Sequence, residues 1–250
     1  MLARFFASAL VAPARIVLVH AGVSYEIILR RTAAARKFTL RVRSAKCDIV
    51  LTMPARSSVS AAREFAQRNA GWVEARVRQL PQRVQFVPGA SIPLRGVEHV
   101  IVHRPHFRKP VWIEAGMALH LSLCVAGEAA HVPRRVQDFL RREAKRDLEA
   151  AVRYHCSKIG KAARTITLRD TTSRWGSCSS RGSLNFSWRL ILAPGFVLDY
   201  LAAHEVAHLQ HMDHSPRFWA VTRSLVPDFE RAEAWLKSNG ASLHRFGGSS

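Results

Sequence analysis

The segment AAHEVAHLQHMDHS, residues 202–215, contains four histidines, with Glu205 directly after the first of them. His204 and His208 are four residues apart, so on a helix they lie on one face, about 6 Å apart along the axis, and can share one metal ion. Zinc prefers imidazole nitrogen, and a catalytic zinc site has three protein ligands and a water. The HExxH pattern therefore predicts two zinc ligands.

Glu205 lies too far around such a helix to be the third ligand, but near enough to reach a water that the metal activates. The metal lowers the pKa of this water to about 7 and polarises a carbonyl, while the carboxylate takes the proton. This chemistry fits peptide-bond hydrolysis. The alternative is a core helix with two hydrogen-bonded histidines. A carboxylate between Ala203 and Val206 argues against it, because a buried carboxylate needs partners.

The third ligand has several candidates. His214 follows His208 by six residues, at the point where the chain should leave the helix and turn back. The third histidine of metzincins has this spacing, but their turn glycine is absent here, and position 211 is a histidine. Glu230 and Glu233 on the following helix would give a gluzincin-like site. We rank His214 first, Glu230 or Glu233 second, and His211 last, as a surface or supporting residue.

Composition excludes several classes of protein. The chain has 250 residues, 48% of them hydrophobic, which suits one large domain or two small ones. No apolar stretch reaches the length of about 18 residues that spans a membrane. The four cysteines, Cys47, Cys124, Cys156 and Cys178, form no CxxC pair, so we expect reduced thiols in a cytoplasmic protein and no cysteine zinc site.

The net charge of +20 is unevenly spread, with +14 in residues 1–110 and +6 in residues 111–250. A basic field attracts polyanions such as nucleic acid. However, the basic residues are dispersed and no nucleic-acid-binding motif is present, so a solvated, arginine-rich surface fits equally well.

The sequence patterns outside the histidine segment predict both strands and helices, and therefore an α+β fold. Four short segments from residue 90 to 124 and three from residue 24 to 53 read as strands, with a helix from about Ser60 to Leu80 between the two groups. A long helix is predicted from Pro133 to Ile159, because apolar residues recur every four positions and Gly160 follows.

Closer to the motif, ITLRD and LNFSWRLIL read as strands joined by the turn SCSSRGS. A helix from about Phe196 to Gln210 carries the histidines. Another opens at Ser215 with Pro216 in its first turn. We expect Gly240 to stop the last helix.

Two long segments together resemble a known family. RWGSCSSRGSLNFSWRLILAP and VLDYLAAHEVAHLQHMDHSPRFW look like the YgjP-like metallopeptidases, which are related to the SprT-like proteases. Upstream, LRRTAAARKFTLRV, DIVLTMP and FAQRNAGWVEARVRQL resemble the N-terminal region of that family. The resemblance covers about residues 25–240 and includes the whole HExxH motif.

The resemblance implies a zincin-like fold, with the HExxH helix packed beside a small sheet and zinc held by His204, His208 and His214. We expect four parts in the chain. Residues 1–22 are a leader or first strand outside the resemblance, 23–130 a β-rich N-terminal region with one helix, 131–240 the zincin-like metallopeptidase domain, and 241–250 a tail.

In zincins an edge strand beside the active-site helix pairs with an extended substrate. LNFSWRLIL is our candidate for that strand, with SRWGSC as its neighbour. Trp175 and Gly176 would line the cleft, although Trp175 equally suits the core of a hairpin. Arg174 is a candidate partner for an oxyanion or carboxylate, and Asn185 a candidate substrate contact. Cys178 lies close enough in sequence to approach the zinc, but packing is its simpler role.

We therefore expect a zinc metallopeptidase with one Zn²⁺ per chain, Glu205 as general base and a polypeptide substrate. One alternative is a nucleic-acid-associated SprT-like protease, or a basic DNA-binding protein with a structural zinc. Another is a non-catalytic module that the metal stabilises.

Overall fold

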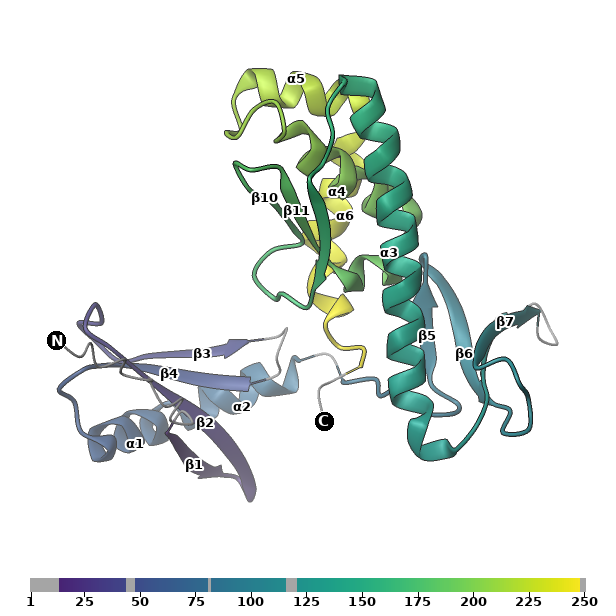
Figure 1. Cartoon of the computed structure of the whole chain (residues 1–250). Helices are drawn as coiled ribbons and strands as arrows, with labels where there is room; N and C mark the ends of the chain where they lie inside the picture. Colours follow the sequence, from purple (N-terminus) through teal and green to yellow (C-terminus); the bar gives the residue numbers. More distant parts are fainter. Residues whose placement is uncertain (1–13, 44–47, 81, 116–120, 248–250) are drawn as a thin grey trace, which may run out of the picture. The chain divides into compact units, whose positions relative to one another are not determined.

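The computed structural model describes residues 14–43, 48–80, 82–115 and 121–247. Cys47 and the first thirteen residues of the expected leader lie outside this part. The chain divides into two compact units, Met1–Pro81 and Gln82–Ser250, which are described separately. Figure 1 shows both as mixtures of helices and sheets.

The first unit is a four-stranded sheet with two helices packed on one of its faces. The strands run in the order β1-β2-β4-β3, and only the β2–β4 pair is parallel. Alternate strand residues, among them Ile27 and Leu51, meet Ala62 and Val73 of the helices in a separate core. The elements are β1 (Arg15–His20), β2 (Val23–Thr32), β3 (Thr39–Arg43), β4 (Asp48–Pro54), α1 (Val59–Arg68) and α2 (Ala70–Arg78).

The single helix expected from about Ser60 to Leu80 is two helices. Asn69 separates them, with a non-helical backbone (φ −106°, ψ 16°), and its side chain donates to the carbonyl of Phe65. An asparagine side chain that donates to a nearby backbone carbonyl competes with the hydrogen bonds of the helix. This explains the break, which the apolar periodicity does not reveal.

The second unit starts with a four-stranded sheet in the order β5-β6-β8-β7. Its strands are β5 (Ser91–Leu94), β6 (Val97–His103), β7 (Val111–Ala115) and β8 (Leu121–Val125). This sheet shares one core with α3 (Val132–Ile159), so the boundary expected near residue 130 falls inside the second unit.

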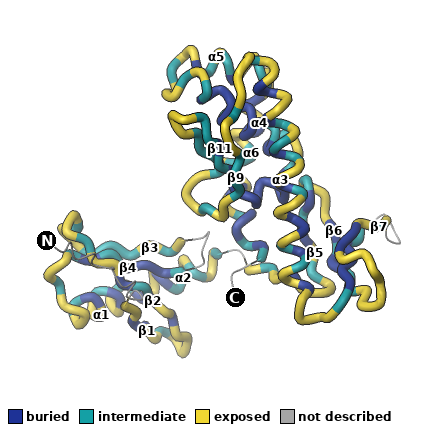
Figure 2. Tube along the Cα trace, viewed as in Figure 1, coloured by how far each residue is buried: buried dark blue, intermediate teal, exposed yellow. Residues whose placement is uncertain are grey.

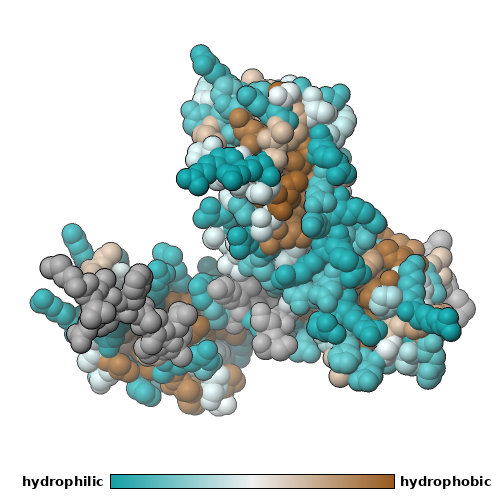
Figure 3. All heavy atoms as spheres, viewed as in Figure 1, coloured by the Kyte–Doolittle hydropathy of each residue, from teal (hydrophilic) through white to brown (hydrophobic). Residues whose placement is uncertain are grey.

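Helix α3 runs where the sequence predicts it, and Gly160 ends it in the left-handed conformation (φ 64°). The apolar stripe is buried, including Val136, Leu140 and Leu148 (Figure 2). Hydrophilic side chains cover the side of α3 that faces the viewer in Figure 3.

A three-stranded sheet lies beside the predicted metal-binding segment. It comprises β9 (Thr165–Arg169), β10 (Gly176–Cys178) and β11 (Ser183–Ser187) in the order β10-β11-β9. The strand expected over LNFSWRLIL is wrong in its second half, because Trp188–Leu192 form the 3-10 helix η3 with every side chain buried. A short segment that is apolar at nearly every position has no helical periodicity, so its sequence resembles that of a buried strand. Strand β11 is also central, and β10 and β9 are the two edges.

Three helices complete the unit: α4 (Gly195–Ala207), α5 (Pro216–Leu225) and α6 (Phe229–Leu243). Gly240 does not stop α6. It is buried inside the helix, where a Cβ would lie 3.2 Å from the ring of Trp175, so its role is close packing. In the described part of the chain, no helix is long and apolar enough to cross a membrane. Cys124, Cys156 and Cys178 are unpaired thiols, as expected.

The expected tail from residue 241 is also wrong as far as residue 247, because this segment is anchored. Leu243 and Phe246 are buried, and Arg189 donates to the carbonyl oxygens of both and to the carboxylate of Asp170. Phe246 further forms an isolated parallel bridge with Val84 at the start of the unit.

The Arg189–Asp170 pair yields a test of stability. Burial disfavours the charged carboxylate, but the hydrogen bond and charge of Arg189 outweigh it, so the pKa of Asp170 is lowered. The pair therefore stabilises the fold above about pH 3.9, the usual unfolded value, and this contribution is lost as the pH falls through the folded pKa.

We expect Asp170→Asn to lower the free energy of unfolding by about 2 kcal/mol at pH 7, because Arg189 loses a charged hydrogen-bond partner. Chemical denaturation at several pH values measures this, and the difference from wild type should shrink toward pH 3. Glu149→Gln, which breaks an exposed pair with Lys145, is the control and should cost less than about 0.5 kcal/mol. An equal, pH-independent loss in both variants would contradict the interpretation.

Candidate metal centre

Helix α4 holds the HExxH motif in the interior of the second unit. It starts after Pro194, and nine of its thirteen residues are buried. His204 and Glu205 lie in its last turn, and His208 is the C-cap residue. The chain then turns back and brings His214 over the helix, just before α5 begins at Pro216.

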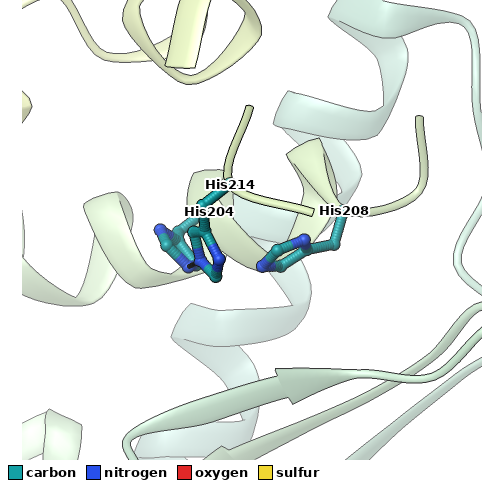
Figure 4. A group of neighbouring side chains, drawn as sticks. All are labelled: His204, His208 and His214. Carbon is teal, nitrogen blue, oxygen red and sulfur yellow. Dashed lines mark hydrogen bonds between the residues drawn. The ribbon is translucent and has the colours of Figure 1, made fainter. Parts of the chain in front are cut away.

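The three histidines share one space (Figure 4). Each offers a ring nitrogen, and these atoms all lie within 4.8 Å of one another. The Nε2 atoms of His204 and His214 are 3.3 Å apart. Two nitrogens bound to one tetrahedral zinc at about 2.0–2.1 Å are separated by about 3.3 Å. The spacing thus fits a shared metal ion.

The second ring nitrogen of His204 and that of His208 have hydrogen-bond partners, which orient these two imidazoles. Nδ1 of His208 lies 3.0 Å from the carbonyl oxygen of His211. Nδ1 of His204 lies 3.4 Å from the hydroxyl of Tyr200, which donates to Glu233 at 2.7 Å. Such bonds fix the tautomer and direct Nε2 toward a metal.

Phe218 packs against all three imidazoles. Its side chain is fully buried, and its ring centroid lies 4.4 Å from that of His208, 4.9 Å from His204 and 4.8 Å from His214. A rigid apolar wall of this kind limits the rotation of the histidines and excludes water from one side of them.

Burial also sets the charge of the site. It lowers the pKa of His204 to about 4, with a further decrease from the neighbouring His208 and His214. Burial likewise lowers the pKa of His208. Both imidazoles are therefore neutral at neutral pH, the form that binds metal ions.

Glu205 is buried beside the histidines, with only 4% of its surface exposed. Burial raises the pKa of its carboxyl group to about 8, against the opposing charge of Arg174. Its Oε2 atom is buried and has no hydrogen-bond partner among the described residues. A nearby cation would bring this pKa down again, because an opposite charge favours the carboxylate.

The rival ligands are engaged elsewhere. Glu230 is half-exposed and forms an ion pair with Arg223. Glu233 is bound to Tyr200, one hydrogen bond removed from His204. His211 contributes its backbone carbonyl to His208. Among the described residues, the group with metal-binding geometry is His204, His208 and His214.

Strand β10 lies against Glu205. A Cβ atom at Gly176 would overlap the carboxylate of Glu205, so this position needs a residue without a side chain. Cys178, on the same strand, is half-buried, and burial together with the charge of Glu205 raises the pKa of its thiol to about 11. Among the described residues, the group with metal-binding geometry does not include Cys178, which agrees with the simpler packing role.

Trp175 combines the two roles considered for it. It stacks on His244, with ring centroids 5.0 Å apart, and packs against Gly240, which makes it part of the core. It also lines a cavity of about 300 Å³ beside His204 and Glu205, together with Tyr200, Leu201, Glu233 and Leu236. Arg174 and Asn185 line a second cavity of about 300 Å³, which Gly176 also borders.

Sequence reasoning did not find Tyr200, Phe218 or Glu233 as supports of the histidines. The signal for Tyr200 was available, because it precedes His204 by four residues and therefore shares its face of the helix. Phe218 and Glu233 belong to α5 and α6, and only the folding of those helices brings them to the site.

A comparison with protein families agrees with this chemistry. The family model described as YgjP-like, metallopeptidase domain, matches residues 36–239. The crystal structure of the metallopeptidase zymogen of Pyrococcus abyssi abylysin is 20% identical to the chain. That match covers 40% of this chain and 97% of that one, with a TM-score of 0.34, too low to establish a shared fold. No curated protein matches the chain.

The ligand set can be tested by metal analysis. We expect His214→Ala to weaken zinc binding by more than about 100-fold, because it removes a ligand and not merely a supporting bond. Equilibrium dialysis with a zinc-sensitive dye measures the affinity. His211→Ala is the control, because this residue acts through its backbone carbonyl, and it should retain the metal. Unchanged affinity in His214→Ala would move the third ligand to another residue.

Proposed function

The chain belongs to the YgjP-like metallopeptidase family, and on that premise we propose that it hydrolyses peptide bonds at one zinc ion held by His204, His208 and His214. The observation that carries this proposal is the meeting of three imidazoles, two of which are held neutral by burial, with a buried carboxylate whose Oε2 atom has no partner among the described residues. The arrangement is then zincin-like, with the HExxH helix beside a small sheet.

The histidines supply the nitrogen ligands, and their hydrogen bonds hold them in position. Zinc, when bound, acts as a Lewis acid that polarises the scissile carbonyl and makes a water molecule acidic. The bond from His208 to the carbonyl of His211 and the chain from His204 through Tyr200 to Glu233 keep both rings oriented.

Glu205 is the proposed general base. It takes a proton from the attacking water and passes it to the leaving amine. Its position supports this role, because Glu205 lies next to His204 on α4 and packs against Gly176 of β10. The buried setting keeps bulk water away and strengthens the charges involved.

The substrate would add to the sheet as a further strand on β10, which replaces LNFSWRLIL as the edge. Ser187 N donates to Trp175 O, and Ser179 N to Ser183 O, so Trp175, Ser177 and Ser179 face β11. By alternation, the N–H and C=O groups of Gly176 and Cys178 face the open edge. Arg174, Trp175, Gly176 and Asn185 remain the proposed substrate contacts, through the two cavities that they line.

The comparisons name a metallopeptidase and do not favour a nucleic-acid-associated protease or a basic DNA-binding protein. A non-catalytic, zinc-stabilised module is distinguished by experiment. In such a module Glu205 would have no effect on chemistry, and removal of the metal would unfold the second unit.

We expect Glu205→Gln to lower kcat by about 10²- to 10⁴-fold, the usual contribution of a general base, while zinc content stays at one per chain. Cleavage of an unstructured protein, followed by mass spectrometry, provides the assay. Glu230→Gln is the control, because that carboxylate is paired with Arg223. Full activity in Glu205→Gln would refute the mechanism.

Gly176→Ala tests the contact between β10 and α4. The added methyl group would overlap the carboxylate of Glu205, so we expect a loss of kcat of about 10²-fold or more at unchanged zinc content. Gly195→Ala is a matched control, because a Cβ there meets no atom within 4 Å. If both variants keep their activity, the position of Glu205 against β10 does not matter for catalysis.

A further inference from the structure

The three-stranded sheet presents a polar face on the side away from Glu205. Gly176 and Phe186 pair across β10 and β11, and the Cβ direction of Gly176 leads to Glu205. The next pair, Ser177 and Asn185, must therefore point to the opposite face. Asn185 also pairs with Thr167 of β9, so this face is polar across all three strands.

A cavity of about 300 Å³ lies at this face, beside the loop that leads into β10. Its polar lining includes Arg169, Thr171, Arg174, Ser177 and Asn185. It contains two guanidinium groups, several hydroxyl groups and an amide, all of which can donate hydrogen bonds.

No carboxylate of the described residues lines the cavity. The nearby Asp170 is bound to Arg189. Arg169 has no carboxylate within ion-pair distance among the described residues, and the charge of Arg174 acts on Glu205 without a salt bridge between them. The cavity is thus positively charged and uncompensated, which favours an anionic ligand.

Gly176 connects this cavity to the metal centre, because it borders the cavity beside Glu205 as well. A peptide strand added to β10 would direct successive side chains to opposite faces of the sheet. One side chain would enter the cavity beside Glu205, and the next would meet Arg169 and Arg174.

We propose that this second cavity binds a carboxylate of the peptide substrate and so determines which peptides the enzyme prefers. The inference rests on the proposed function, since it assumes that a peptide adds to β10. Guanidinium groups match a carboxylate through paired hydrogen bonds. The carboxylate is either an Asp or Glu side chain within the peptide or the C-terminal carboxylate of the peptide.

Peptide binding to zinc-loaded Glu205→Gln protein tests the proposal without turnover. Fluorescent hexapeptides blocked at both ends carry Glu or Gln at each position in turn, and anisotropy gives Kd. We expect the peptide with Glu at one position to bind about fivefold more tightly than the peptide with Gln there. If a second position responds, it should be two residues away, because alternate residues of a strand point to the same face. The other possible source is the C-terminal carboxylate. It is tested by comparing the Kd of a neutral peptide that has a free C-terminus with the Kd of the same peptide after amidation.

Substitutions then locate the binding groups. Arg169→Gln and Arg174→Gln, made in the Glu205→Gln background, should each reduce the carboxylate preference to less than about twofold. Arg181→Gln is the matched control. It removes the same charge from the turn between β10 and β11, outside the cavity, so this variant should keep the preference. All three arginines are exposed, so folding should be unaffected.

The outcomes separate this inference from the proposed function. If peptides bind and the wild type cleaves them, but neither carboxylate source improves Kd, the cavity has no such role. A preference that survives in both Arg169→Gln and Arg174→Gln also overturns it. Selective binding without cleavage by the wild type would instead refute the peptidase mechanism, and the absence of both binding and cleavage would refute both proposals.

Discussion

The contact between the carboxylate of Glu205 and the backbone of Gly176 determines the geometry of the whole site. A helix and a strand approach this closely only where one of them lacks a side chain. The apolar residues around α4, such as Val206 and Leu201, hold the helix in the core, and Phe218 holds the histidines. The proposed base, the metal ligands and the open strand edge are therefore parts of one packing arrangement.

The sequence predicts what depends on local spacing. Helix α3 has a repeat of four apolar residues and a terminal glycine, and it forms within one residue of the expected start. The HExxH spacing brings His204, in the last turn of α4, and His208, at its C-cap, to one site, although the helix ends at Ala207 and not at the expected Gln210. The turn expected after His208 favours His214 as the third candidate, and His214 does lie with the other two histidines.

What the sequence could not predict depends on contacts between distant segments. Trp188–Leu192 are apolar at nearly every position, and only burial between several elements distinguishes a 3-10 helix from a strand there. Gly240 looks like a helix stop until Trp175, 65 residues earlier, packs against it. The edge position of β10 follows from sheet order, which no short motif encodes.

The anchoring of Phe246 to Val84 and Arg189 has a consequence for how the protein is made. These contacts join the beginning, middle and end of the second unit. During synthesis the chain emerges from its N-terminus, so the histidine motif leaves the ribosome while the segment that completes its surroundings does not yet exist. Glu233 and His244 leave the ribosome after the motif. A newly made chain would thus acquire ordered surroundings for the histidines only after α6 and the segment up to Phe246 have been synthesised.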